Sequence, residues 1–320
     1  MSQSILPPVI RIEPSASCNL ACAHCPTGTI EMTRGIMKKN IFDKILKELE
    51  SHKNTVRVVV LYHGGEPLLN KHFATMVRQI KNIGISQVKT VSNGMLIDDA
   101  KIKEIIESGI DSIEFSLDGR SPEENNFIRR KSSFAVVSEN IKKLLDYKIL
   151  YSKNNLKVYL SNTQFLPTEN PGEHISLPPE APKYLKQTFS GKYEEHLEYK
   201  CTWAMEWPHM GDTKEYFNYW TDRSDAELKS KCSLVYDTMT FRWNGDVVAC
   251  CFDLTSQYVL GNISETNLNS IWNGKKYEFI RNSIQSKKHI KMCSQCNMIR
   301  PPVYLLYKNE LEVRFNNFAW

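Results

Sequence analysis

Short apolar segments alternate with amphipathic segments along the first half of the chain. The apolar segments are predicted strands: 9–13, 55–62, 87–94, 111–119 and 156–162. The segments between them have apolar residues at helical spacing and are predicted helices: 39–51, 71–83, 97–108 and 134–147. This alternation is typical of parallel βα units. With a sixth strand predicted near 197–207, the pattern favours an α/β fold with an open or partial barrel over a closed eight-stranded one.

Polar residues follow four of these predicted strands at the point where each strand ends. A cysteine-rich loop follows the first strand, and His-Gly-Gly-Glu-Pro (63–67) follows the second. Ser-Asn-Gly (92–94) ends the third and Ser-Leu-Asp-Gly (116–119) ends the fourth. Ligands of parallel α/β folds bind at the carboxyl ends of strands, so these segments predict one shared binding site.

The loop after the first strand contains Cys18, Cys22 and Cys25 in a C-x3-C-x2-C pattern. Three thiolates can hold three irons of a [4Fe–4S] cluster and leave the fourth iron open to a small molecule. An open position on a metal centre is typical of chemistry, whereas closed sites are structural. The alternative from the residues alone is a zinc ion whose fourth ligand is His24 or a distant side chain.

Composition limits the class of protein. The net charge of +5 is spread along the chain and does not favour nucleic-acid binding. No apolar run approaches the ~20 residues of a membrane span, and no secretory signal precedes the first strand. We therefore expect a cytoplasmic protein without a membrane partner, in which the nine cysteines are metal ligands or reactive thiols.

A second group of cysteines lies in the C-terminal part. Residues 238–250 predict a β-hairpin with its turn at Asn244-Gly245. Four thiolates can close a second iron–sulfur cluster or a zinc site, and the candidates are Cys232, Cys250, Cys293 and Cys296. Cys251 is an alternative ligand to Cys250.

Four further side chains are candidate catalytic residues near the predicted sixth strand and the hairpin. Cys201 and Cys251 are either small buried apolar residues or reactive thiols at the substrate. Glu206 and His209 are either rim residues or general bases. The dense aromatic residues between 193 and 220 suit either stacking on a sugar or packing between subdomains.

The C-x3-C-x2-C loop after a first strand and Gly-Gly-Glu-Pro after a second resemble the radical S-adenosylmethionine (SAM) superfamily. The resemblance spans roughly residues 9 to 210 and implies a partial (β/α)6 barrel of the TIM type. It implies that the amino and carboxylate groups of SAM chelate the fourth iron. Reductive cleavage of SAM would then give a 5′-deoxyadenosyl radical that abstracts a hydrogen atom from the substrate.

The same resemblance assigns roles to individual side chains. Cys18, Cys22 and Cys25 match the cluster ligands, and His24 matches the position that lies against the adenine. The remaining matches follow the chain. They are Gly64, Gly65 and Glu66 for the SAM amino group, Ser92 and Asn93 for the ribose, Ser116 and Asp118 with Ser116 near the SAM carboxylate, and either Arg129 or Arg130 for that carboxylate.

The C-terminal cysteine pattern resembles the twitch subdomain, a shortened form of the SPASM domain that carries one auxiliary [4Fe–4S] cluster. The expected division is therefore a radical SAM barrel over 1–210, a linker over 211–231, and a twitch subdomain with a C-terminal tail over 232–320.

The resemblance implies two reactions on a small polyhydroxylated substrate such as a sugar, nucleotide sugar or aminocyclitol. One is oxidation of a carbinol, with the auxiliary cluster accepting an electron; the other is epimerisation, with a thiol returning hydrogen. Both need an electron donor such as flavodoxin or ferredoxin. The alternatives are a peptide- or protein-modifying maturase, for which no leader-binding module is expected before Cys18, and a non-catalytic iron–sulfur or zinc scaffold.

Overall fold

In the computed structural model, the described residues are 6–151, 155–208, 216–221, 227–308, 311 and 314–315. Nine strands form one sheet in the order β10-β9-β8-β1-β2-β3-β4-β5-β6. The first six are β1 (Val9–Ile12), β2 (Val58–Val60), β3 (Gln87–Ser92), β4 (Ser112–Ser116), β5 (Lys157–Gln164) and β6 (Leu197–Trp203). All neighbouring pairs from β1 to β6 are parallel. The predicted α/β partial barrel is therefore confirmed.

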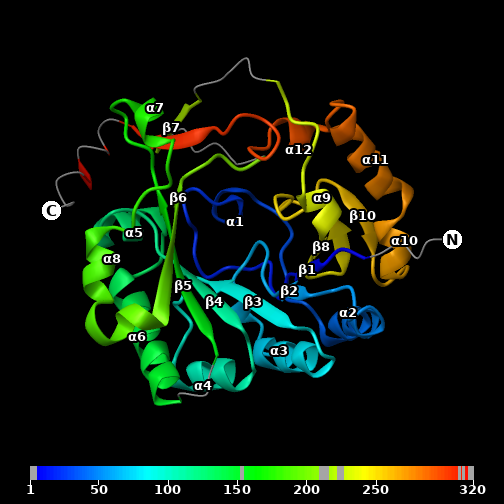
Figure 1. The fold of residues 1–320 in the computed structure, drawn as a ribbon, viewed down its shortest axis with the longest axis horizontal. Helices are drawn as coiled ribbons and strands as arrows, with labels where there is room; N and C mark the ends of the chain where they lie inside the picture. The colour runs from blue at the N-terminus through cyan, green and yellow to red at the C-terminus, as the bar shows by residue number, and fades with distance from the viewer. Residues whose placement is uncertain are drawn as a thin grey trace.

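Helices cover the outer face of this parallel sheet (Figure 1). The longer ones are α2 (Lys39–Ser51), α3 (Phe73–Asn82), α4 (Asp99–Glu107) and α6 (Phe134–Leu150). Shorter helices are α5 (Pro122–Ile128), α7 (Pro171–His174) and α8 (Lys183–Thr188), whereas α1 (Pro26–Thr29) lies on the inner side of the sheet (Figure 1). The start of α4 shows why a helix begins where it does. The carboxylate of Asp98 caps the helix by accepting a hydrogen bond from the Lys101 N–H at 2.7 Å.

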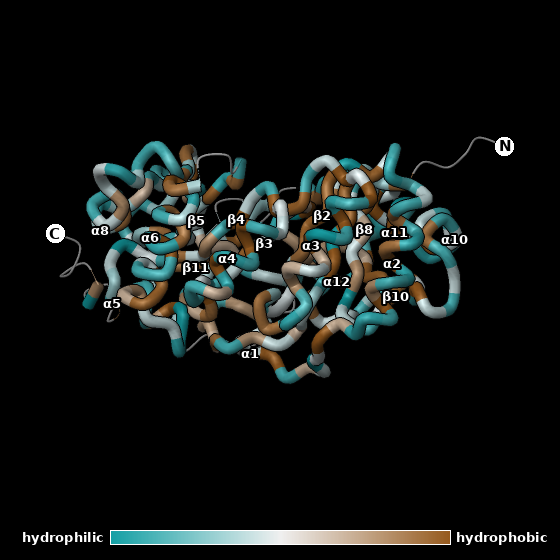
Figure 2. Tube along the Cα trace, turned by 90° about the horizontal axis from the view of Figure 1, so that it is seen from below, coloured by the Kyte–Doolittle hydropathy of each residue, from teal (hydrophilic) through white to brown (hydrophobic). Residues whose placement is uncertain are grey.

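The core lies between the sheet and these helices. Ile10, Ile12, Val59 and Phe115 are fully buried, and each such side chain contributes about 1.5–3 kcal/mol through removal from water. In the view from below, hydrophobic segments gather at the strands and hydrophilic turns lie mainly at the periphery (Figure 2). None of the described helices is both long enough and apolar enough to cross a lipid bilayer.

The C-terminal hairpin extends the barrel sheet. It consists of β8 (Thr238–Phe241) and β9 (Asp246–Val248), followed by β10 (Val259–Asn262). Strand β8 pairs in parallel with the free edge of β1, and β9 pairs antiparallel with both β8 and β10. Helices α9 (Leu234–Asp237), α10 (Leu268–Trp272), α11 (Lys275–Gln285) and α12 (Lys291–Ser294) complete this part. The predicted hairpin is confirmed, and it shares a sheet with the barrel.

The chain then returns to the far side of the barrel. Strand β11 (Tyr304–Tyr307) pairs antiparallel with β7 (Phe217–Trp220) and crosses near the end of β6 (Figure 1). The Leu305 N–H donates to the Ala204 carbonyl at 2.9 Å, which joins β11 to the residues after β6. The ring of Phe165 stacks on Phe217 with 4.6 Å between centroids. Of the two uses predicted for the aromatic residues, those at 216–217 therefore serve packing between distant segments of the chain.

Candidate active site

A cavity opens at the carboxyl ends of β1 to β4, where the sequence predicts the shared site. Its volume is about 160 Å³. Its lining includes eleven of the side chains that the sequence assigns to the cluster and to SAM: Cys18, Cys22, His24, Cys25, Gly64, Gly65, Glu66, Ser92, Asn93, Ser116 and Arg129. Leu20, Thr27, Gly28, Tyr62, His63, Val91, Trp207 and Leu254 complete it.

The Gly-Gly-Glu segment packs directly on the cysteine loop. A Cβ atom added at Gly65 would lie 2.4 Å from the carbonyl oxygens of Ser15 and Ser17, so only glycine fits there. The Glu66 N–H donates to the Ser17 carbonyl at 2.9 Å. The segment after β2 is therefore fixed against the chain that leads into Cys18.

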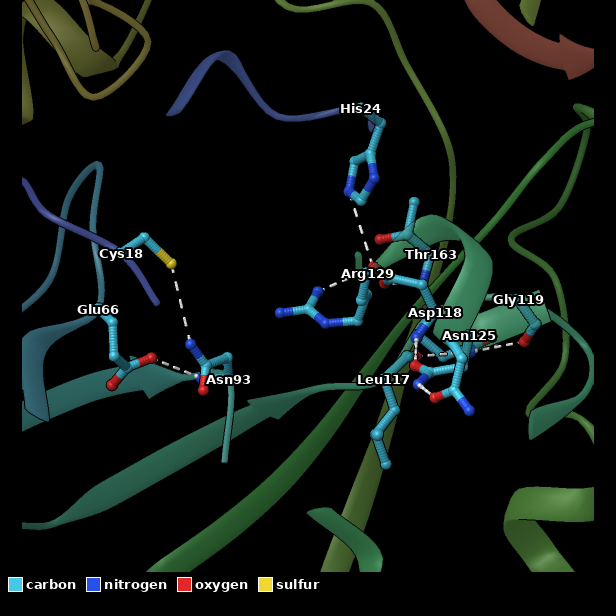
Figure 3. A network of polar contacts seen from close by, with 12 residues as sticks. Cys18, His24, Glu66, Asn93, Leu117, Asp118, Gly119, Asn125, Arg129 and Thr163 are labelled. Atoms are coloured by element: carbon cyan, nitrogen blue, oxygen red, sulfur yellow. Dashed lines mark hydrogen bonds and ion pairs between the residues drawn. The ribbon is translucent and has the colours of Figure 1, made fainter. Parts of the chain in front are cut away.

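The carboxylate of Glu66 connects this segment to the turn after β3. It is buried and accepts hydrogen bonds from the Leu68 N–H at 3.1 Å, the Ser92 hydroxyl at 2.9 Å and the Asn93 N–H at 2.8 Å. The Asn93 amide donates to Asn19 Oδ1 at 2.8 Å and lies 3.9 Å from Cys18 Sγ (Figure 3). Glu66 thus orients the turn that faces the cysteine loop.

Asp118 organises the opposite side of the cavity. Its Oδ2 accepts a hydrogen bond from Arg129 Nη1 at 2.8 Å and lies 3.7 Å from His24 Nε2 (Figure 3). Burial lowers the pKa of His24, although the Asp118 charge opposes that shift. Arg130 instead places its guanidinium over the ring of Tyr216, 4.4 Å from the centroid. Of the two arginines, only Arg129 lines the cavity. Asp118 does not line it, but it contacts Arg129 and His24, which do.

The donor groups around the cavity fit the expected cofactors. Arg129 Nε and His24 Nδ1 are buried and have no hydrogen-bond partner. Both can therefore form hydrogen bonds with polar groups of a bound ligand. Burial raises the pKa of Cys18, and it raises that of Cys22 to about 12. Binding to iron favours the thiolate and would offset this desolvation. Among the described residues, no three His, Cys, Asp or Glu side chains gather around one point, as a single ion would require. Ligands of a cluster instead bind separate irons.

The C-terminal cysteines form a second group beside this cavity. Burial, together with the neighbouring thiols of Cys251, Cys296 and Cys293, raises the pKa of Cys250 well above its usual value. Cys232 contributes to the electrostatic environment of both Cys293 and Cys296, so it belongs to the same group. The arrangement can provide four thiolates from three segments of the chain, as an auxiliary cluster requires.

Cys250 and Cys251 differ in their surroundings. Cys250 is buried within the main hydrophobic core. Burial raises the pKa of the Cys251 thiol, and the charge of Arg11 on β1 opposes that shift. Burial raises the pKa of Tyr62, which lines the cavity, and the charge of Cys251 adds to that shift. Cys251 therefore lies on the barrel side of the hairpin.

A buried ion pair joins the two parts of the site. Glu13, at the end of β1, accepts a hydrogen bond from Arg242 Nε at 2.7 Å, and both side chains are almost completely buried. The other Glu13 oxygen accepts from the Gly64 N–H at 3.0 Å. Arg242 also donates to the carbonyl of Leu254, which lines the cavity. Sequence reasoning missed this pair, although a charged residue directly after an apolar strand was a usable signal.

Besides Cys251, the sequence predicts three candidate catalytic side chains, and the structure describes two of them. Cys201 shares a strand face with Tyr199, whose hydroxyl donates to the Leu185 carbonyl of α8, so it faces the outer helices and not the cavity. Glu206 is ion-paired with Arg300, which removes the free carboxylate expected of a base. His209 lies outside the described residues. Their predicted catalytic roles gain no support from this geometry.

The separation of the two arginines gives a direct prediction. Arg129→Gln is expected to weaken SAM binding by about 10- to 100-fold, because a hydrogen bond to a charged group contributes roughly 1.5–3 kcal/mol. Arg130→Gln is the matched control and is expected to leave the dissociation constant within about twofold, since its guanidinium packs on Tyr216. Equilibrium binding of SAM to the cluster-loaded protein measures both. Equal weakening by the two variants would contradict the assignment.

Comparisons with known proteins agree with this site. A model of the radical SAM superfamily matches residues 12–170, and a model of an iron–sulfur cluster-binding domain (SPASM) matches residues 232–297. The tungsten-containing aldehyde ferredoxin oxidoreductase cofactor-modifying protein of Pyrococcus furiosus is 24% identical over 318 residues, covering 90% of this chain and 86% of that protein.

Two solved structures share the fold at low sequence identity. BtrN in complex with AdoMet and 2-DOIA has a TM-score of 0.56 at 16% identity, covering 91% of this chain and 93% of that one. The anSMEcpe structure with bound AdoMet and Cp18Cys peptide has a TM-score of 0.57 at 17% identity, covering 90% and 85%. The two family matches together cover more than half of the chain. The chain therefore belongs to the radical SAM superfamily, with S-adenosylmethionine and a [4Fe–4S] cluster as cofactors and a C-terminal domain for auxiliary iron–sulfur binding.

Proposed function

We propose that this radical SAM enzyme abstracts a hydrogen atom from a small polyhydroxylated molecule and epimerises it, with Cys251 as the hydrogen donor. The observation that carries the proposal is the different placement of two adjacent thiols. Cys250 lies in the core with Cys293, and Cys296 is also buried and acts on Cys250 electrostatically, which suits a cluster ligand. The charge of Arg11 acts on Cys251 and that of Cys251 acts on Tyr62, as well as on Cys296 of the second group, and a thiol between the two sites suits one that meets substrate.

The charged side chains on the inner wall of the barrel favour a polar substrate. Lys200 on β6 donates to the Glu114 carboxylate of β4 at 2.6 Å and lies 3.7 Å from the centroid of the Tyr159 ring. Glu114 shares a strand face with Ser116, which lines the cavity. Hydroxyl groups of a substrate can exchange hydrogen bonds with such a wall, which an apolar substrate cannot do.

When bound, the cluster and SAM supply a 5′-deoxyadenosyl radical that takes one hydrogen atom from a substrate carbon. Cys18, Cys22 and Cys25 would hold that cluster, and Arg129 would pair with the carboxylate of SAM. The Cys251 S–H bond then breaks as a new C–H bond forms on the opposite face of the substrate carbon. The resulting thiyl radical needs one electron and one proton to return to a thiol. A one-electron donor such as flavodoxin or ferredoxin would provide the electron, directly or through the auxiliary cluster.

Dehydrogenation is the second candidate. The fold similarity to BtrN, solved with AdoMet and 2-DOIA, favours it, as does a cysteine group that can hold an electron-accepting cluster next to the cavity. Modification of a peptide is the third, because anSMEcpe with its bound Cp18Cys peptide shares the fold to the same extent.

Isotope uptake separates these reactions. In deuterated water, with reductant and a small-molecule fraction of cell extract, we expect 5′-deoxyadenosine formation and one carbon-bound deuterium in a single metabolite. Cys251→Ser should stop deuterium uptake while keeping the iron content. Cys201→Ser is the matched control, because that thiol faces the outer helices, and should retain uptake.

The other outcomes overturn the proposal. A new carbonyl without deuterium at the reacting carbon indicates a dehydrogenase. Stimulation by the peptide fraction alone indicates a peptide-modifying enzyme.

A further inference from the structure

Arg11 is a cation on the inner wall of the barrel. Along β1, Ile10 and Ile12 are fully buried in the core, so the alternation of strand side chains places Arg11 on the opposite, barrel-facing side. Its guanidinium lies over the ring of Tyr62, 4.9 Å from the centroid, and Nη1 donates to the Tyr62 carbonyl at 3.2 Å. Tyr62 itself lines the cavity, so the guanidinium lies at the edge of the active site.

This guanidinium differs from the other arginines around the site in its lack of a counter-ion. Arg129 is paired with Asp118 at 2.8 Å and Arg242 with Glu13 at 2.7 Å. Of the carboxylates that the structure describes, none lies within 4.0 Å of the Arg11 guanidinium. Its Nε atom is buried and has no hydrogen-bond partner. A buried donor on a charged group is costly to leave unpaired, so an anion that reached this guanidinium would be bound favourably.

A second cation shares this wall. Val91 on β3 lines the cavity, and the alternation of β3 places Lys89 on the same face as Val91. Lys89 and Arg11 come from strands that flank β2, where Val60 pairs with both residues in register. Lys200, the third cation of the wall, is already neutralised by Glu114. The positive charge is therefore greatest on the β1–β3 side.

We propose that Arg11, assisted by Lys89, binds an anionic group of the substrate, so that the substrate is an acidic small molecule bearing a phosphate or a carboxylate. Guanidinium groups bind both anions through two parallel N–H bonds, which also orients the molecule. Within the function proposed above, on which this inference rests, the anion would hold one end of the substrate on β1 while its reacting carbon faces the cysteine loop.

The test measures binding and needs no turnover. Pyrophosphate and malonate are titrated calorimetrically into the cluster-loaded protein at constant ionic strength, and the same is done with two variants. We expect Arg11→Gln to weaken binding of the preferred anion at least tenfold and Arg11→Lys to restore part of it. Arg78→Gln removes an exposed cation from α3 and should leave binding unchanged. Selective loss for pyrophosphate assigns a phosphate, and selective loss for malonate assigns a carboxylate.

Two results would overturn the inference. Equal affinity of the wild type and Arg11→Gln for both anions would exclude an anion site at Arg11. A shifted auxiliary-cluster potential in Arg11→Gln with unchanged anion binding would make Arg11 a counter-ion of that cluster, since it lies beside Cys251. Failure of the epimerisation experiment would leave the binding result intact, so the two proposals fail separately.

Discussion

Cys18→Ala is expected to abolish formation of 5′-deoxyadenosine from SAM, with a fall of at least a thousandfold. The three cysteines of the loop line one cavity, and a cluster that loses one of its three protein ligands loses the site at which SAM binds iron. Because the Asn93 amide lies beside Cys18 Sγ, the substitution also removes a contact between the loop and β3. Anaerobic incubation with SAM and dithionite, followed by chromatography, measures the product.

Cys232→Ala is the comparison variant, because Cys232 belongs to the C-terminal group and not to the cavity lining. It should lose iron but keep at least part of the SAM cleavage. Complete loss of cleavage in both variants, with both still folded, would contradict the division of the cysteines into two sites.

Arg242→Met is expected to lower the free energy of unfolding by about 3–5 kcal/mol, because it leaves the Glu13 carboxylate buried without its partner. The Glu13 side chain is completely buried and accepts three hydrogen bonds, from Arg242 Nε and from the N–H groups of Gly64 and Trp243. The carbonyl of Leu254 would lose its donor as well. Urea unfolding followed by circular dichroism measures the loss.

The double variant Glu13→Gln/Arg242→Met removes both charges and keeps an oxygen acceptor at position 13, so it should be more stable than Arg242→Met alone. Lys39→Met breaks an exposed pair with Asp43 on α2 and should cost less than about 1 kcal/mol. A double variant that is less stable than Arg242→Met would show that the Glu13 charge itself is not the source of the loss.

Local patterns in the sequence predicted the barrel well. The strands and helices of 9–162 have clear periodicities, and the predicted ranges overlap the observed elements from β1 to β5. The polar segments at the strand ends were equally informative, because the carboxyl ends of parallel strands must share an edge. The cysteine spacing identified the ligand loop without reference to any distant part of the chain.

Features that depend on distant segments were less accessible. Nothing local indicates that β8 pairs with β1, or that Arg242 would neutralise Glu13. The choice between Arg129 and Arg130 also depends on the three-dimensional structure, because the side chains of adjacent residues at the end of a helix point in different directions. For Cys201 the signal was present but unused. Lys200 and Cys201 are adjacent on β6, so their side chains point to opposite faces of the strand. A lysine on the polar inner face therefore predicts that the Cys201 thiol is on the outer face.

The position of β1 has a consequence for how the chain folds during synthesis. This strand lies between β2 and β8, so one of its edges has no partner until residues near 241 leave the ribosome. At about 5–20 residues per second, the interval lasts roughly 10–50 s. An open edge on a hydrophobic strand attracts other chains during that time, and the cysteine loop that follows it is exposed to oxidation. Rapid expression should therefore favour inclusion bodies, whereas slow translation with an early iron supply should favour soluble enzyme.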